Sequence, residues 1–212
     1  MKDDDTDMNA IHSLPPHHFQ AQFTALKDQI SPHFLFNSLS VLSSLVRRDP
    51  DLSEQFIDHL ARVYRYLLEH RDNERVTLDE ELSFARSYAF LLEVRFARKF
   101  KVNIPSAASM GNYTLLPFTL QLLIENAIRH NRMSVADPLV IDICLCHLEQ
   151  GCCLSVGNNL QIRSQPDGGR GQGLAGIQHR YAQLTGRLVQ VLPQENLFTV
   201  NVPLLSNDAS LG

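Results

Sequence analysis

The sequence predicts an α/β fold that is preceded by an all-α helical hairpin. Up to about residue 73 the apolar residues recur only at helical spacing, whereas helical and strand patterns alternate from about residue 74 onward. With 212 residues and 44% hydrophobic content, the chain can form one medium domain or two small ones with a real core. We expect a disordered acidic lead at 1–19, the hairpin at 20–73, the α/β domain at 74–205 and a tail at 206–212.

Charge and hydropathy argue against two classes of partner. The formal net charge is -4, and the Lys and Arg residues are interleaved with acids rather than gathered in blocks, which argues against nucleic-acid binding. No window approaches the roughly 20 apolar residues of a membrane span, and the N-terminus is acidic where a signal peptide is basic. We expect a cytoplasmic chain that meets a membrane only through a sensor domain outside it.

The helical part is interpreted as an antiparallel hairpin. Its first helix, at about 20–48, has an apolar seam of Leu35, Leu39, Leu42 and Val46. Asp49-Pro50 interrupts the pattern, and Asp51 with Glu54 resembles a capping box that starts the second helix. That helix has a matching seam of Ile57, Leu60, Tyr64 and Leu67. A lone hairpin leaves such a seam in water, so we expect a homodimer with a four-helix bundle through Leu35, Leu39, Ile57, Leu60 and their neighbours.

The α/β part begins with a short strand at Val76 and Thr77, where Thr77 and Glu80 form a capping-box pattern. A helix should follow, then the strand KVNI and a second helix in LLPFTLQLLIENAIRHN. The runs LVIDICLCHL and CCLSV flank a turn and predict a β-hairpin. A glycine-rich loop, a helix at about 174–184 and two final strands complete the chain.

The four cysteines crowd into one short stretch of that hairpin, at Cys144, Cys146, Cys152 and Cys153. They lack the paired C-x-x-C spacing of a structural zinc site. We interpret them as reduced strand residues, and metal binding or a redox role is the alternative.

Three motifs could support chemistry. In QISPHFLFN, Pro32 removes a backbone donor, and His33 begins a polar stripe with Asn37, Ser40 and Ser44; the alternative is an ordinary surface histidine. In ENAIRHN, Asn126 is an oxygen ligand suited to Mg²⁺, or else part of a merely polar helix end beside Glu125 and His130. In GRGQGL, the glycines at Gly171 and Gly173 before Leu174 let backbone amides approach phosphate, and the alternative is a flexible loop.

Together, in this order, the three motifs resemble the sensor histidine kinases of the LytS type, whose catalytic domain is an α+β sandwich of the Bergerat (GHKL) type. The resemblance runs from about residue 25 to 205 and implies ATP and Mg²⁺ as cofactors. PHFLFN resembles the phosphoacceptor motif and implies His33 as the phosphorylated residue. ENAIRH resembles the N box, which implies Asn126 as the Mg²⁺ ligand and places His130 near the nucleotide. GQGL resembles the second glycine box, which implies that Gly171, Gly173 and Leu174 lie near the triphosphate. The implied partner is a response regulator of the LytR type, which accepts the phosphate on an aspartate.

The sequence departs from this family at the first glycine box. Where Asp-x-Gly-x-Gly is expected, Asn158-Asn159-Leu160-Gln161-Ile162 stands, so both glycines are gone and Asn158 would face the adenine amino group without charge. Phe34 follows the histidine where many kinases of other classes have an acid, which leaves Glu125 as the candidate general base. The alternatives are a pseudokinase that acts as a dimeric scaffold, and an ATPase without histidine transfer.

Overall fold

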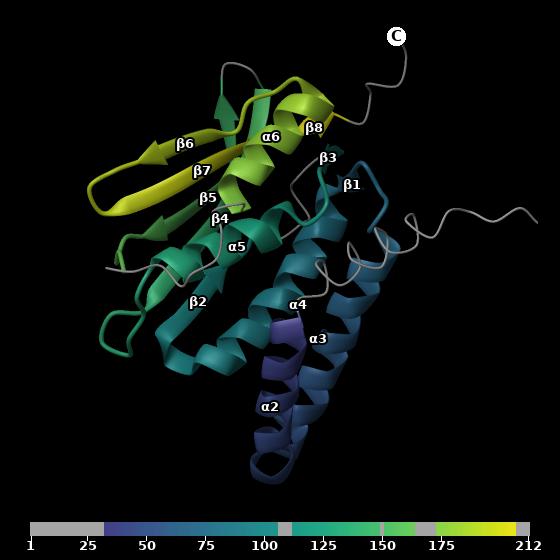
Figure 1. Cartoon of the computed structure of the whole chain (residues 1–212), viewed down its shortest axis with the longest axis vertical. Coiled ribbons are helices and arrows are strands. Elements are labelled where there is room, and N and C mark those ends of the chain that lie inside the picture. Colours follow the sequence, from purple (N-terminus) through teal and green to yellow (C-terminus); the bar gives the residue numbers. More distant parts are fainter. Residues whose placement is uncertain (1–31, 106–111, 149–150, 164–172, 207–212) are drawn as a thin grey trace, which may run out of the picture.

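A computed structural model describes residues 32–105, 112–148, 151–163 and 173–206. It contains a layer of helices on one face of a five-stranded sheet, with a helical hairpin that projects from this sandwich (Figure 1). The α/β fold with a preceding helical hairpin, predicted from the sequence, is therefore confirmed.

The larger sheet has the strand order β2-β4-β5-β7-β6. Its strands are β2 (Phe100–Asn103), β4 (Leu139–Leu148), β5 (Gly151–Asn159), β6 (Gln190–Pro193) and β7 (Leu197–Pro203). Only β2 and β4 pair in parallel; the other pairs are antiparallel, and β4 with β5 forms the expected β-hairpin. A smaller antiparallel sheet has the order β1-β3-β8, from β1 (Val76–Thr77), β3 (Tyr113–Leu115) and β8 (Leu205–Ser206).

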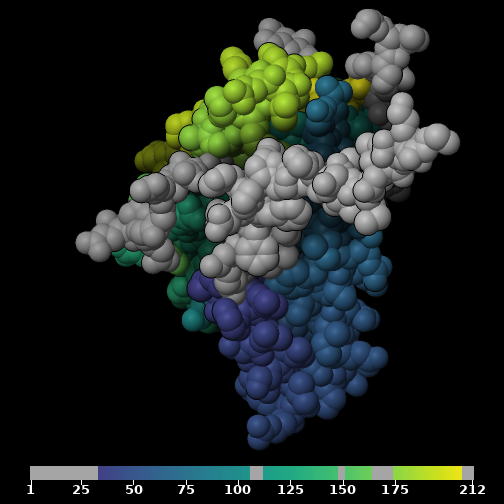
Figure 2. Space-filling view, turned by 45° about the vertical axis from the view of Figure 1, so that its right-hand side comes forward, coloured from purple at the N-terminus to yellow at the C-terminus, as the bar shows by residue number. Residues whose placement is uncertain are grey.

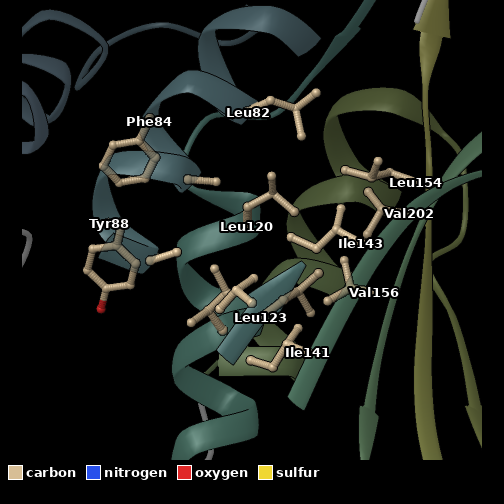
Figure 3. Packing of buried hydrophobic residues seen from close by; sticks show 14 of the residues in the cluster. Leu82, Phe84, Tyr88, Leu120, Leu123, Ile141, Ile143, Leu154, Val156 and Val202 are labelled. Carbon is tan, nitrogen blue, oxygen red and sulfur yellow. The ribbon is translucent and has the colours of Figure 1, made fainter. Parts of the chain in front are cut away.

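The helices divide between the hairpin and the sandwich. The hairpin consists of α2 (Pro32–Arg48) and α3 (Pro50–Glu69), and the sandwich holds α4 (Leu78–Phe96), α5 (Thr119–His130) and α6 (Gly173–Thr185). A 3-10 turn, η1 (Ala97–Lys99), connects α4 to β2. Leu120 and Leu123 of α5 point toward Ile141, Leu154 and neighbouring strand residues between the two layers (Figure 3). Burial of this apolar surface holds the sandwich together.

Capping side chains fix where two of the helices begin. The side chain of Asp49 accepts a hydrogen bond from the Leu52 N–H, with Pro50 in the first turn of α3. The predicted cap at Asp51 with Glu54 is therefore wrong by two residues, because the proline that seemed only to break the first helix also starts the second. The predicted capping box of Thr77 and Glu80 is confirmed at the start of α4.

The hairpin packs against α4 and leaves one apolar stripe exposed. Leu60 and Leu42 are partly buried against the core, so these members of the predicted seam pack within the chain. The exposed large apolar residues of the hairpin are 47% to 68% exposed: Phe36, Leu39, Val46, Ile57 and Leu68. In Figure 2 the hairpin forms a lobe that protrudes from the rest of the molecule.

The cysteines differ from the expectation that all four are reduced. Cys146 of β4 and Cys153 of β5 are directly opposite in the antiparallel ladder, with Cα atoms 5.0 Å apart, and form a disulfide. Cys144 and Cys152 are free. The sequence predicted that the two strands are adjacent, but the cysteine pairing depends on the register of the strands, which sequence patterns did not specify.

Several expectations lie outside the described residues: the acidic lead at 1–19, the first helix before residue 32 and the chain after residue 206. Ser206 itself belongs to β8 rather than to a tail. Within the described ranges, no helix combines the length and apolarity that a bilayer crossing requires.

Candidate functional site

A cavity of about 450 Å³ opens where α5 ends, beside β5, β7 and the start of α6. Ten of the described residues line it: Asn126, Arg129, His130, Asn131, Asn158, Leu160, Ile162, Arg163, Leu174 and Phe198. The apolar members can contact a flat ring, and the polar and cationic members can contact anionic groups. This size and composition suit a small anionic organic ligand.

The cavity brings together four of the residues singled out from the sequence. Asn126 and His130 come from the last turns of α5, Asn158 from the end of β5 and Leu174 from the first turn of α6. Gly173 is the first residue of α6, whereas Gly171 lies outside the described residues.

Asn158 presents a hydrogen-bond acceptor at this cavity. It is 5% exposed and lies between Ile141 of β4 and Phe198 of β7 in the ladder. Its side-chain Nδ2 donates to the Asn159 carbonyl at 2.8 Å, which fixes the orientation of the amide. Among the described residues no donor contacts its Oδ1. That oxygen is therefore available to accept a hydrogen bond from a ligand.

The segment after β5 is hydrogen-bonded to the end of α5. The buried Asn131 accepts the Gln161 N–H at its Oδ1 (2.8 Å) and donates from Nδ2 to the Ala127 carbonyl (2.9 Å). The Arg163 N–H donates to the His130 carbonyl at 3.0 Å, and its Nε donates to the Asn131 carbonyl at 2.8 Å. The residues that replace the first glycine box thus form an ordered wall of the cavity.

Positive charge and backbone dipoles gather at the same place. Arg129 and Arg163 line the cavity, and the N-terminus of α6 reaches it through Leu174. A helix N-terminus and guanidinium groups both favour phosphate. The site therefore has the electrostatics of a phosphate-binding pocket.

Asn126 fits a Mg²⁺ ion that is held mainly by phosphate. Its half-buried side chain lines the cavity and makes no hydrogen bond to the other described residues. Among the described residues no group of three or more His, Cys, Asp or Glu could hold a metal. One amide oxygen with waters and phosphate oxygens is a normal shell for Mg²⁺, so the donor set suits a metal that arrives with a nucleotide.

Glu125 points away from the cavity. It is not among the lining residues, and its Oε1 accepts hydrogen bonds from the Tyr88 hydroxyl (2.8 Å) and the Gln121 amide (2.9 Å). Burial and the neighbouring Glu125 carboxylate raise the pKa of Tyr88, so its hydroxyl keeps its proton and stays a donor. The Tyr88 ring packs against Phe34 with ring centroids 5.2 Å apart. Glu125 is thus linked to the residue beside His33.

His33 is exposed in the first turn of α2 and does not line the cavity. In the polar stripe that it begins, Ser40 and Ser44 are also exposed, while Asn37 is half-buried. An exposed imidazole on a protruding helix is accessible to a second site or a second protein.

Sequence reasoning missed Arg129, Asn131, Arg163 and Phe198. Arg129 and Asn131 belong to the ENAIRHN motif, so its cationic and amide residues were visible signals. Arg163 and Phe198 reach the cavity from segments far along the chain, and only strand pairing places Phe198 beside Asn158.

Residues 21–100 match the family model described as histidine kinase. The chain is 36% identical over 110 residues to the sensor histidine kinase/phosphatase LytS of Staphylococcus aureus (strain MRSA252), covering 52% of this chain and 19% of LytS. It is 29% identical over 167 residues to the sensor histidine kinase BtsS of Escherichia coli (strain K12), covering 79% of this chain and 30% of BtsS. The chain thus spans less than a third of the length of these relatives.

Two solved structures are similar at a low level. The catalytic domain of histidine kinase ThkA gives a TM-score of 0.41 at 17% identity and covers 61% of this chain and 94% of that one. A histidine kinase from Burkholderia phymatum STM815 gives 0.41 at 12% identity and covers 90% and 94%.

If the Oδ1 of Asn158 accepts from an adenine amino group, Asn158→Leu should weaken ATP binding about two- to tenfold, the range for one neutral hydrogen bond. Inosine triphosphate lacks that amino group, so its affinity should change less. Calorimetric titration of both nucleotides against both proteins measures the two effects. Equal losses for the two nucleotides would mean that Asn158 does not face the base.

Proposed function

Because this chain belongs to the LytS-type histidine kinases, we propose that it transfers phosphate from Mg-ATP to its own His33 and then to an aspartate of a response regulator. The observation that carries the proposal is the cavity that joins Asn126 and His130 of the N box to Asn158 and Leu174. The family places these functions on the corresponding motifs. The regulator would be of the LytR type, and the reaction would take place in the cytoplasm.

The cavity residues have distinct roles in nucleotide binding. Asn158 would accept a hydrogen bond from the adenine amino group, and Phe198 with Leu160 would contact the base. Arg129, with the first turn of α6 at Gly173 and Leu174, would hold the phosphates. Asn126 would hold Mg²⁺, which neutralises charge on the transferring phosphate when bound.

His33 would act as the nucleophile. Neutral imidazole carries a lone pair on one ring nitrogen, so it can attack the phosphate without a strong base. Positioning and electrostatics then supply most of the catalysis. Glu125 is the candidate base, and its Oε1 accepts hydrogen bonds from Tyr88 and Gln121, which hold its carboxyl group in a fixed orientation.

The exposed stripe of α2 and α3 supports a homodimer. Phe36, Leu39, Val46 and Ile57 remain in water in one chain, and a second hairpin would cover them. The interface would then form a four-helix bundle that presents the exposed His33 to the nucleotide site and to the response regulator.

One observation favours a second candidate, a pseudokinase scaffold. The segment that replaces the first glycine box is fixed to α5 by Gln161 and Arg163, so it lacks the freedom that glycines would provide. A scaffold of this kind would bind nucleotide weakly and signal through contacts of the dimer.

Incubation with ATP labelled at the γ-phosphate separates these functions. The wild-type chain should retain label that is acid-labile and alkali-stable, and His33→Gln should lose it while its ADP affinity stays within about twofold, because His33 is outside the cavity. Wild-type label in His33→Gln would contradict the assignment. No label with weak ADP binding would favour the scaffold, and ADP release without label would indicate an ATPase.

Ile57→Glu tests the dimer. A charge in place of an apolar contact, repeated by the symmetry of the interface, should weaken dimerisation at least about tenfold. Val135→Glu, at a 54% exposed position outside the hairpin, is the matched control and should leave dimerisation unchanged. Sedimentation equilibrium measures both; equal dissociation constants for the two variants would place the interface elsewhere.

A further inference from the structure

Glu81 of α4 is a fully buried carboxylate that contacts two other helices. Its Oε2 accepts hydrogen bonds from the Tyr66 hydroxyl of α3 and from the Phe118 N–H at 3.1 Å. Its Oε1 accepts the Leu120 N–H at 2.8 Å. Buried carboxylates are costly unless paired, and here three donors compensate. None of the motifs discussed above includes this residue.

The two backbone donors belong to the N-terminus of α5. Phe118, the N-cap residue, has a positive φ of 66° and offers no side-chain cap. Glu81 therefore caps α5 from another helix, and its negative charge lies at the positive end of the helix dipole. Asn126 and His130 lie on the same helix, toward the cavity at its other end. The position of this cap sets the position of α5 along its axis.

The third donor connects the hairpin to this cap. Tyr66 lies in the last turn of α3, and its ring stacks on Phe84 at 4.2 Å between centroids and meets Phe118 edge-on at 5.7 Å. A shift or rotation of α3 would thus act directly on the atoms that hold the start of α5.

The other helix of the cavity meets the same junction. The Tyr181 hydroxyl of α6 accepts the Leu116 N–H at 3.3 Å and is 3.4 Å from the Thr119 hydroxyl. Tyr181 is fully buried. The loop before α5 is therefore held by Glu81 on one side and by α6 on the other.

We propose that Glu81 and Tyr66 are positioning residues that couple the hairpin to the nucleotide site, because one buried carboxylate ties the end of α3 to the start of α5. This inference rests on the proposed kinase function. Through the link, the arrangement of the hairpin sets where Asn126 lies when His33 reacts. Neither residue lines the cavity, so the link acts on the transfer step rather than on binding.

Tyr66→Phe tests the link in the full chain, since it removes the hydroxyl but keeps the stacked ring. Labelling from γ-labelled ATP at saturating ATP should be about tenfold slower than in wild type, which is the effect of losing one hydrogen bond to a charged group. The half-saturating ATP concentration should stay within about twofold of the wild-type value. Tyr64→Phe is the matched control, because among the described residues the Tyr64 hydroxyl has no hydrogen-bond partner. Its labelling rate should stay within twofold of wild type.

Hydrogen exchange of the same proteins gives a readout that does not need activity. The amides at 118–123 should exchange at least about fivefold faster in Tyr66→Phe than in wild type or Tyr64→Phe, because the cap is weakened. Glu81→Gln keeps the side-chain shape but cannot accept all three hydrogen bonds, so it should change labelling and exchange in the same direction.

Each outcome decides the inference. If Tyr66→Phe and Glu81→Gln match wild type in labelling and exchange, the link does not exist. If Tyr66→Phe raises only the half-saturating ATP concentration, Tyr66 acts on binding and the coupling is refuted. If the wild-type chain takes up no label, the kinase function fails. In that case, faster exchange in Tyr66→Phe but not in Tyr64→Phe still supports the mechanical link. Unchanged exchange in Tyr66→Phe overturns the link.

Discussion

The Glu81 carboxylate joins parts of the molecule that the chain itself connects only through loops. It lies on α4, a helix of the sandwich that also packs against the hairpin, and it accepts hydrogen bonds from α3 and from the start of α5. Most of the surrounding core is apolar and non-directional, so it can tolerate small shifts of one helix against another. Three hydrogen bonds to one buried carboxylate have a defined geometry, and they fix which arrangement of the helices is occupied.

The cavity depends on the same helix in a different way. At its C-terminal end, α5 is joined by Asn131 to the segment that follows β5, so that Asn158 and Asn126 lie on the walls of one pocket. Hydrogen bonds from Gln161 and Arg163 to Asn131 provide the order that this segment has without the glycines of the family pattern. The pocket is therefore built from ordered backbone at the C-terminal end of α5.

Much of this architecture could be predicted from the sequence, because periodicity, capping patterns and turn signals are local. The hairpin, most of the strands and the grouping of Asn126 with His130 follow from such signals, whereas the short strand β3 at Tyr113–Leu115 was not predicted. The start of α3 was placed two residues late, since Asp49 and Asp51 both suit a cap and only the backbone decides between them. The disulfide of Cys146 and Cys153 required the strand register.

The Glu81 junction and the orientation of Glu125 could not be predicted. Glu81 follows Glu80 in the charged first turn of α4, and a turn of this composition is expected to face solvent. Glu81 becomes buried only because α3 and the loop before α5 cover it in the folded chain. Glu125 is next to Asn126 in sequence, but successive helical residues face different directions, and Tyr88 holds it on the side of α4.

The pH dependence of stability tests the buried carboxylate most directly. Burial raises the pKa of Glu81 to about 7. The hydrogen bonds from Tyr66 and from the backbone, and the charge of Arg180, lower this pKa and so oppose the effect of burial. Tyr181 is the other titratable group near the Glu81 carboxyl. A carboxyl group whose pKa is higher in the folded state binds more protons in that state than in the unfolded state. The contribution of Glu81 to stability is therefore complete below the unfolded pKa of 4.5, and it is lost as pH rises through about 7.

Urea unfolding of the wild type and Glu81→Gln between pH 4.5 and 8 measures this contribution, because the titration of all other groups cancels in the difference. The wild type should lose on the order of 3 kcal/mol of unfolding free energy relative to the variant as pH rises across this range. A difference that stays constant with pH would show that the pKa of Glu81 is the same in the folded and unfolded states, which would contradict a pKa raised by burial at the junction between hairpin and sandwich.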